Sequence, residues 1–210
     1  MIRLPRLYGI VDAEVAARHG WTVPALARAY VKAGVRLLQV RAKAMPSGAF
    51  LDACDEVVAA AREAGALVTV NDRPDIARLS EAAGVHVGQD DLSIGAVRRL
   101  VGPDAIVGLS THTPAQIDHA SRAPISYVAV GPAFDTVSKP TGYDAVGLDL
   151  VRYAARSPGG RPVVAIGGIT LDRAPKVLEA GAASVAVISD LLTGGDPQAR
   201  ARAFVELLGE

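Results

Sequence analysis

The amino-acid sequence predicts an α/β protein, a single (β/α)8 barrel of the TIM type that covers residues 1–210. Short apolar runs alternate along the whole chain with helical stretches rich in Ala, Arg and Glu, which is typical of βα units in a parallel sheet. We count eight such units in 210 residues, near the short end for this barrel. The alternative is an open doubly wound sheet, but no G-x-G-x-x-G loop follows the first strand.

The elements are expected in strict alternation. The strands are expected at residues 7–11, 35–41, 67–71, 84–88, 105–110, 125–130, 162–166 and 183–188, where the runs are apolar as in strands covered on both faces. The helices are expected at residues 24–33, 47–64, 75–82, 93–101, 113–123, 148–155, 171–180 and 197–208. The longest connection, residues 131–147, is rich in Gly, Pro, Thr and Ser, and a loop of that length in a compact domain is usually functional or disordered.

Composition narrows the classes of partner and compartment. Lys and Arg number 22 and Asp and Glu number 22, so the zero net charge argues against nucleic acid or an anionic membrane as the main partner. Small anionic ligands remain compatible with it. The lone Cys54 excludes an internal disulfide, and neither a signal peptide nor a membrane span is recognisable. We therefore expect a cytoplasmic protein without membrane contact.

The last two strands predict a phosphate site. Gly167 and Gly168 follow the seventh strand and, having no Cβ, let the backbone turn sharply close to a ligand. The eighth strand is followed directly by Ser189, the first residue of a short helix expected at residues 189–192. In eight-stranded α/β barrels the loops after strands seven and eight form the common phosphate site. A phosphorylated small molecule is therefore the expected ligand.

The helix between these two strands has one clear end. Thr170 is expected to cap it, and Gly181 is expected to end it in a left-handed conformation. Pro175 falls about one turn inside, so the position of the first helical residue stays open.

The second strand carries polar side chains toward the barrel interior. With a period of two, Leu38 and Val40 face the helices, whereas Gln39 and Arg41 point inward. Buried polar groups need partners. One interpretation is an internal salt bridge. The other is recognition of an anion by Arg41 and Lys43, which suits a diphosphate.

Two carboxylates follow neighbouring strands. Asp72 ends the third strand after Asn71, and Asp91 comes just after the fourth. Each alone is typical of a helix N-cap. Together they lie at corresponding points of adjacent strands, and converging carboxylates with no Cys or His cluster favour Mg²⁺. His86, in the middle of its strand, is interpreted as a satisfied interior histidine.

The fifth and sixth strands end in hydroxyl groups. Ser110 has no base in a nucleophile-elbow setting, so we expect its hydroxyl to form a hydrogen bond with substrate and not to attack it. His112 is open to two roles, proton shuttle or surface cap. Thr136, Ser138 and Lys139 lie on the long loop and are interpreted as a closing segment over phosphate oxygens. A solvated loop is the alternative.

The assembled pattern resembles the thiamine-phosphate synthase family. The matching segments are QVRAK, VNDRPDIA, GVHVGQDDL, GLSTH, GPAFDTVSK, VVAIGGIT and AGAASVAVIS, in that order over nearly the whole chain. The ND and GQxD pair and the lysine that ends the loop motif are specific, whereas IGGI occurs in many phosphate-binding barrels. Two positions depart from the family pattern: Ala42 replaces an acidic residue, and Ser138 replaces the usual threonine.

This resemblance implies a reaction and a set of residues. Members join a pyrimidine-methyl diphosphate to a thiazole phosphate and release pyrophosphate through a dissociative, carbocation-like displacement. The residues implied for the pyrimidine diphosphate are Gln39, Arg41, Lys43, Asn71, Ser110 and Lys139, of which Lys139, Arg41 and Ser110 are implied to be catalytic. Those implied for the thiazole phosphate are Thr136, Ser138, Gly168, Ile188 and Ser189, and Asp72 and Asp91 are implied to bind Mg²⁺.

Three other functions remain in competition. A thiazole tautomerase would use His112 and would need neither the carboxylate pair nor Lys139. A non-catalytic sensor would bind a thiazole or thiamine phosphate without releasing pyrophosphate. A sugar-phosphate lyase or isomerase would share only the phosphate site of strands seven and eight. The sequence leaves the oligomeric state open, with a homo-oligomer as one outcome.

Overall fold

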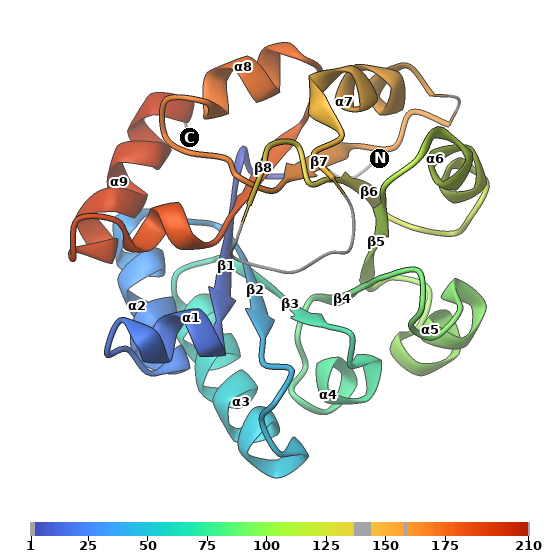
Figure 1. The fold of residues 1–210 in the computed structure, drawn as a ribbon. Helices are drawn as coiled ribbons and strands as arrows, with labels where there is room; N and C mark the ends of the chain where they lie inside the picture. The colour runs from blue at the N-terminus through green and yellow to red at the C-terminus, as the bar shows by residue number, and fades with distance from the viewer. Residues whose placement is uncertain (1–2, 137–143, 158, 210) are drawn as a thin grey trace.

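The computed structural model describes residues 3–136, 144–157 and 159–209. Within them, parallel strands form a closed barrel in sequence order, with β1 paired to both β2 and β8 (Figure 1). The strands are β1 Leu7–Asp12, β2 Leu37–Arg41, β3 Leu67–Asn71, β4 Gly84–Val87, β5 Ile106–Thr111, β6 Tyr127–Val130, β7 Val163–Ile166 and β8 Ser184–Val187. The predicted (β/α)8 barrel is confirmed.

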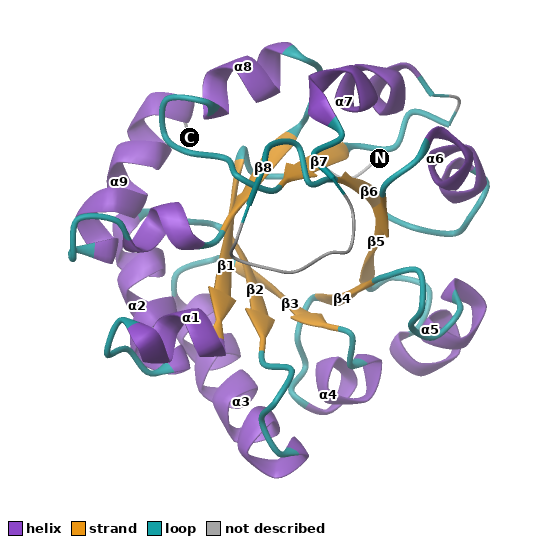
Figure 2. Ribbon diagram, in the orientation of Figure 1, coloured by secondary structure: helices purple, strands orange, loops and turns teal. Residues whose placement is uncertain are grey.

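The helices form a ring around this barrel (Figure 2). They are α1 Ala13–Arg18, α2 Val23–Ala33, α3 Ser47–Glu63, α4 Pro74–Leu79, α5 Ile94–Val101, α6 Pro114–Ser121, α7 Gly147–Arg156, α8 Ala174–Glu179 and α9 Pro197–Leu208, with the 3₁₀ helix η1 at Ser189–Leu192. The short helix after β8 thus has the predicted bounds. In the part of the chain that the structure describes, no helix has the length and apolar character to cross a membrane.

One helix was absent from the prediction. Helix α1 follows β1 directly because Asp12 caps it, accepting hydrogen bonds from the backbone N–H groups of Glu14 (3.1 Å) and Val15 (3.0 Å). Its Ala-rich sequence favours a helix. The carboxylate at the strand end, followed by alanine and glutamate, was the signal that could have revealed it.

The prediction that Thr170 caps helix α8 was wrong. The helix begins at Ala174, and Thr170 instead donates its hydroxyl to Asp172 at 2.6 Å. Pro175 sets the start, because its missing N–H and fixed φ are tolerated only in the first turn. The end is as predicted: Gly181 has φ +103° immediately after the last turn.

The barrel interior carries most of the buried polar side chains. Leu38 and Val40 of β2 are fully buried in the apolar layer under the helices, as predicted. Between them, Gln39 points into the barrel and is 5% exposed. The same alternation places Thr69 of β3 and His86 of β4 in buried positions. Buried polar side chains require hydrogen-bond partners, so the barrel interior at these positions does more than pack apolar side chains.

Gly84 gives a direct test of how closely β4 and β5 approach. A Cβ at this position would lie 1.9 Å from the backbone oxygen of Ile106, its register partner. Because backbone cannot move aside as a side chain can, Gly84→Ala is expected to lower the free energy of unfolding by about 3 kcal/mol. Urea unfolding measures the difference.

Gly95 of helix α5 is the matched control, because a Cβ there would meet nothing within 4 Å. Gly95→Ala is expected to raise the free energy of unfolding by up to about 1 kcal/mol through helix propensity. Equal stability of the two variants would contradict the proposed close approach at Gly84.

Candidate functional site

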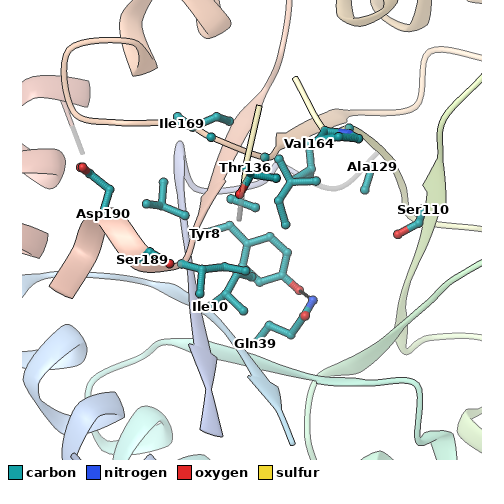
Figure 3. Close-up of a pocket in the computed structure, with 18 of the residues that line it drawn as sticks. Tyr8, Ile10, Gln39, Ser110, Ala129, Thr136, Val164, Ile169, Ser189 and Asp190 are labelled. Atoms are coloured by element: carbon teal, nitrogen blue, oxygen red, sulfur yellow. Dashed lines mark hydrogen bonds between the residues drawn. The ribbon is translucent and has the colours of Figure 1, made fainter. Parts of the chain in front are cut away.

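A cavity of about 320 Å³ is lined by residues at and beyond the carboxyl ends of the strands. Figure 3 shows it from the barrel mouth, with Tyr8 near its centre and Ser110 and Ser189 on opposite sides. Active sites of (β/α)8 barrels lie at this end. Among the predicted site residues, those that line this one cavity are Gln39, Arg41, Asn71, Ser110, Thr136, Gly168, Ile188 and Ser189.

The remaining predicted residues divide into two groups. Asp72 interacts directly with both Lys43 and Asp91, next to Asn71, which itself lines the cavity. Ser138 and Lys139 lie outside the described residues, so their predicted role over the cavity has no structural test.

Arg41 is held by a partner that the sequence analysis did not identify. Its guanidinium forms an ion pair with Asp12, the residue opposite it in the register of β1 and β2. The side chains of Arg41 and Asp12 are 11% and 2% exposed. Of the two interpretations of Arg41, the internal salt bridge is therefore present. The Nε atom of Arg41 is buried without a hydrogen-bond partner among the described residues, which leaves a donor for an anion in the cavity.

The carboxylates of Asp72 and Asp91 interact directly. Burial raises the pKa of Asp91; the Gly88 N–H, 2.7 Å from its Oδ2, opposes that rise, and the neighbouring Asp72 adds to it. Burial acts in the same direction on Asp72, but Lys43, whose Nζ lies 3.0 Å from Oδ2, and Asp91 outweigh it and lower its pKa. The pair therefore favours holding one proton or a cation.

Neither carboxylate is a helix cap, so that alternative is excluded. Helix α4 follows Arg73 without a side-chain cap, and helix α5 is capped by Ser93, whose hydroxyl accepts from the Ala96 N–H. Asp72 also has φ +62°, which few residues other than glycine adopt. Backbone strain of this kind is often found at functional sites.

The chemistry of the donor set fits Mg²⁺. Asp72 and Asp91 offer carboxylate oxygens as ligands, and a bound cation would relieve the repulsion between their negative charges. Over the described ranges, no group of three or more His, Cys, Asp or Glu side chains is close enough to hold a metal. With two protein carboxylates, further ligands for Mg²⁺ would come from water and substrate phosphate, as is usual for this ion.

The opposite side of the cavity is formed by the loops after β6, β7 and β8. Gly167 and Gly168 have φ of +101° and +61°, as predicted for a sharp turn. A Cβ on Gly168 would lie 2.5 Å from the Asp135 oxygen, so the close neighbour is the β6 loop. The Phe134 N–H donates to the Gly167 oxygen at 3.0 Å. This turn therefore fixes the loop segment that leads to Thr136.

Asp190 holds the same region together from β8. Its Oδ2 accepts hydrogen bonds from the Leu171 N–H at 3.1 Å and from Arg200 at 2.7 Å. The loop after β7 is thereby tied to helices η1 and α9. The sequence analysis singled out neither Asp190 nor Arg200, because the sequence of a short helix does not show which residue of another element its acidic side chain will contact.

A network of hydrogen bonds among mostly buried side chains forms the floor of the cavity, which Tyr8, Gln39, His86 and Ser110 line. Tyr8 bonds to Gln39 (3.1 Å), to Tyr127 (3.1 Å) and to Thr69. His86 bonds through Nδ1 to Tyr127 (2.9 Å) and through Nε2 to Ser110 (2.8 Å). The prediction that His86 is an interior histidine with hydrogen-bond partners is confirmed. The roles of Tyr8 and Tyr127 were missed, because a tyrosine within an apolar run is ordinarily interpreted as a packed core residue.

His112 lines the cavity with its ring fixed. Nδ1 donates to the Gly131 oxygen at 2.5 Å, and the backbone N–H donates to Gln116 Oε1 at 2.7 Å. The bond from the His112 ring to Gly131 therefore joins the residue after β5 to the start of the loop that follows β6.

Together, the closed parallel barrel and a cavity at the carboxyl ends of its strands, where polar side chains converge within an apolar lining, define a (β/α)8-barrel enzyme. Residues 7–191 match the family model described as thiamine monophosphate synthase. The chain belongs to this family and is a transferase of thiamine biosynthesis.

Individual relatives agree with this assignment. The chain is 43% identical to thiamine-phosphate synthase of Acidothermus cellulolyticus, over 97% of this chain and 94% of that protein. It is 44% identical to thiamine-phosphate synthase of Koribacter versatilis, over 99% and 97%. The solved structure of thiamine phosphate pyrophosphorylase from Pyrococcus furiosus superposes with a TM-score of 0.86 at 27% identity, over 97% of this chain and 95% of that one.

Proposed function

We propose that the chain couples 4-amino-2-methyl-5-pyrimidinemethyl diphosphate with 4-methyl-5-hydroxyethylthiazole phosphate, or its carboxylated form, to give thiamine phosphate and pyrophosphate. One observation carries the proposal: residues that the family resemblance assigns to each of the two substrates line one cavity, among them Gln39 and Ser110 for the first and Gly168 for the second. Asp72 and Asp91 are paired beside this cavity. Both substrates are anions, and the cavity combines cations, hydroxyl groups and backbone N–H groups that suit them.

The proposed reaction begins with loss of the diphosphate. The bond between the methylene carbon and the diphosphate oxygen breaks, the pyrimidine amino group stabilises the resulting cation, and the thiazole nitrogen then bonds to that carbon. When bound at Asp72 and Asp91, Mg²⁺ supplies positive charge that offsets the departing diphosphate. Arg41, Lys43 and Lys139 supply the remainder from this chain.

The other residues hold the two rings in place. Gln39, Asn71 and Ser110 orient the pyrimidine diphosphate. The residues proposed for the thiazole phosphate are Thr136, Ser138, Gly168, Ile188 and Ser189. Holding the thiazole nitrogen against the cationic carbon gives the proximity contribution, and the loop at residues 131–147 excludes water that would trap the cation.

The decisive experiment is incubation of the purified protein with both phosphorylated precursors, with and without Mg²⁺. Thiamine phosphate and pyrophosphate are expected in equal amounts, and only with Mg²⁺ present. Isomerisation of the thiazole phosphate without Mg²⁺ would favour the tautomerase instead. Tight binding without pyrophosphate release would favour the sensor. Cytoplasmic location, absence of nucleic-acid partners and homo-oligomerisation stay predictions.

A further inference from the structure

Six consecutive strands each contribute one side chain to the buried network. Tyr8 comes from β1, Gln39 from β2, Thr69 from β3, His86 from β4, Ser110 from β5 and Tyr127 from β6. Ser110 ends the network on the cavity side, where Tyr8, Gln39 and His86 also line the cavity, and Thr69 is fully buried at the other end. A hydrogen-bonded chain that ends at a cavity residue can control how that residue meets a ligand.

The packing fixes the rings of the network. A Cβ at Gly108 would lie 2.1 Å from Cζ of Tyr127, so the glycine in β5 makes room for this ring. The ring stacks on His86 with an interplanar angle of 18° and meets Tyr8 edge to face at 86°. The hydroxyl groups therefore have few alternative orientations.

The number of protons available at Tyr8 leaves two possible directions for the hydrogen bonds of the network. Burial raises the pKa of Tyr8 and that of Tyr127, so each hydroxyl keeps its single proton. The amide Nε2 of Gln39 is a donor only and occupies one lone pair of the Tyr8 oxygen. Tyr8 must then donate to one of its two remaining partners, Thr69 or Tyr127, and accept from the other.

Thr69 decides between these directions. Its Oγ1 has no hydrogen-bond partner except the Tyr8 hydroxyl within the described residues, and its side chain is fully buried. If Tyr8 donated to Thr69, the proton of Thr69 would be left without an acceptor, which is costly inside a protein. Thr69 therefore donates to Tyr8, and Tyr8 donates to Tyr127.

The same assignment of protons extends from Tyr127 to the cavity. Having accepted from Tyr8, Tyr127 donates to Nδ1 of His86. An imidazole that accepts at Nδ1 carries its proton on Nε2, which donates to Oγ of Ser110. Because Ser110 receives this bond, its own hydroxyl proton is left for a group in the cavity.

We propose that Tyr127 is a positioning residue that, through His86, makes Ser110 a hydrogen-bond donor to an acceptor atom of the ligand. The acceptor is a diphosphate oxygen or ring nitrogen of the pyrimidine substrate, and this part of the inference rests on the proposed function. The direction of the hydrogen bonds does not, because it follows from the protein alone.

The first test is the tautomer of His86 in the free protein. Long-range ¹H–¹⁵N correlation spectra of the ¹⁵N-histidine-labelled chain distinguish protonation at Nε2 from protonation at Nδ1. The chain has 4 histidines, and the spectrum of a His86→Asn variant identifies the resonance. We expect the neutral Nε2–H tautomer. A His86 protonated at Nδ1 would overturn the proposal, whatever activity the protein has.

The second test is Tyr127→Phe, which removes the donor to His86 and keeps the ring. The Nδ1–H tautomer of His86 is expected to become detectable. The KM for the pyrimidine diphosphate is expected to rise about tenfold, the loss of one hydrogen bond to a charged group, while the KM for the thiazole phosphate stays unchanged. An unaltered tautomer and unaltered KM values would overturn the proposal.

Two variants separate this effect from a disturbance of packing. Tyr30→Phe removes a buried hydroxyl that has no partner among the described residues, outside the barrel interior, and is expected to leave both KM values unchanged. Thr69→Val removes the alternative acceptor of the Tyr8 proton, so His86 is expected to keep its Nε2–H tautomer. A switch to Nδ1–H in Thr69→Val would overturn the deduced direction, even if Tyr127→Phe failed to fold.

Discussion

Asp91→Asn is expected to lower Mg²⁺-dependent turnover at least about a hundredfold while raising the thermal stability of the metal-free protein. Asparagine retains the shape of the side chain and an oxygen that can accept from the Gly88 N–H. What it loses is the negative charge that, together with Asp72, suits Mg²⁺. Turnover at saturating Mg²⁺ and the melting temperature without Mg²⁺ are the two measurements.

The stability change follows from the sign of the pKa shift. Burial first, and then Asp72, raise the pKa of Asp91 above its ordinary value of 3.8. The stability contributed by protonated Asp91 is therefore present at acid pH and is lost as the pH rises through the folded-state pKa. Asparagine never ionises and keeps that contribution. The difference in melting temperature between variant and wild type should thus grow from acid to neutral pH.

Asp72 makes the opposite contribution. Its pKa is lowered overall, because Lys43 and Asp91 outweigh the effect of burial. The stability it provides is present above the ordinary carboxyl pKa and is lost as the pH falls through the lowered folded-state value. Asp72→Asn should accordingly differ from wild type in the direction opposite to Asp91→Asn at neutral pH.

Asp90→Asn is the matched control for Asp91. It removes one charge from the same exposed turn, and it is expected to keep both turnover and the rise in melting temperature that we expect on adding Mg²⁺. An Asp91→Asn protein that Mg²⁺ stabilises as strongly as wild type would remove Asp91 from the proposed metal site.

The sequence was sufficient for features that depend on neighbours along the chain. The ends of β3 and α9 were predicted to the residue, since Asn71-Asp72 and Asp196-Pro197 mark them locally. The convergence of Gln39 with Ser189 also followed, because the carboxyl ends of parallel strands meet at one rim.

Features that depend on lateral partners could not be predicted in this way. Asp12 joins Arg41 only through the register of β1 and β2, and Tyr127 reaches His86 only through the shape of the closed barrel. In the sequence, Tyr127 stands in an apolar run and Gly108 lies inside the predicted strand 105–110, with nothing to show why that position is a glycine. The space that Gly108 leaves for the tyrosine ring becomes visible only when β5 and β6 are placed side by side.

Asp12→Asn is expected to lower the free energy of unfolding by about 3 kcal/mol. Asparagine can still accept from the Glu14 and Val15 N–H groups and so retains the cap of helix α1. The charge of Arg41 would remain buried without its counter-charge. Removing one member of a buried ion pair costs far more than the pair itself contributes, because the other charge stays desolvated. Urea unfolding at neutral pH measures the change.

An exposed ion pair provides the control. Glu56 pairs with Arg28 at 3.4 Å, with side chains 58% and 48% exposed, so Glu56→Gln should change the free energy of unfolding by less than about 0.5 kcal/mol. Pyrophosphate should also recover part of the loss in Asp12→Asn, since an anion bound in the cavity gives Arg41 a new counter-charge. If Asp12→Asn were as stable as Glu56→Gln, Arg41 would not depend on Asp12, and its orientation toward the cavity would need another cause.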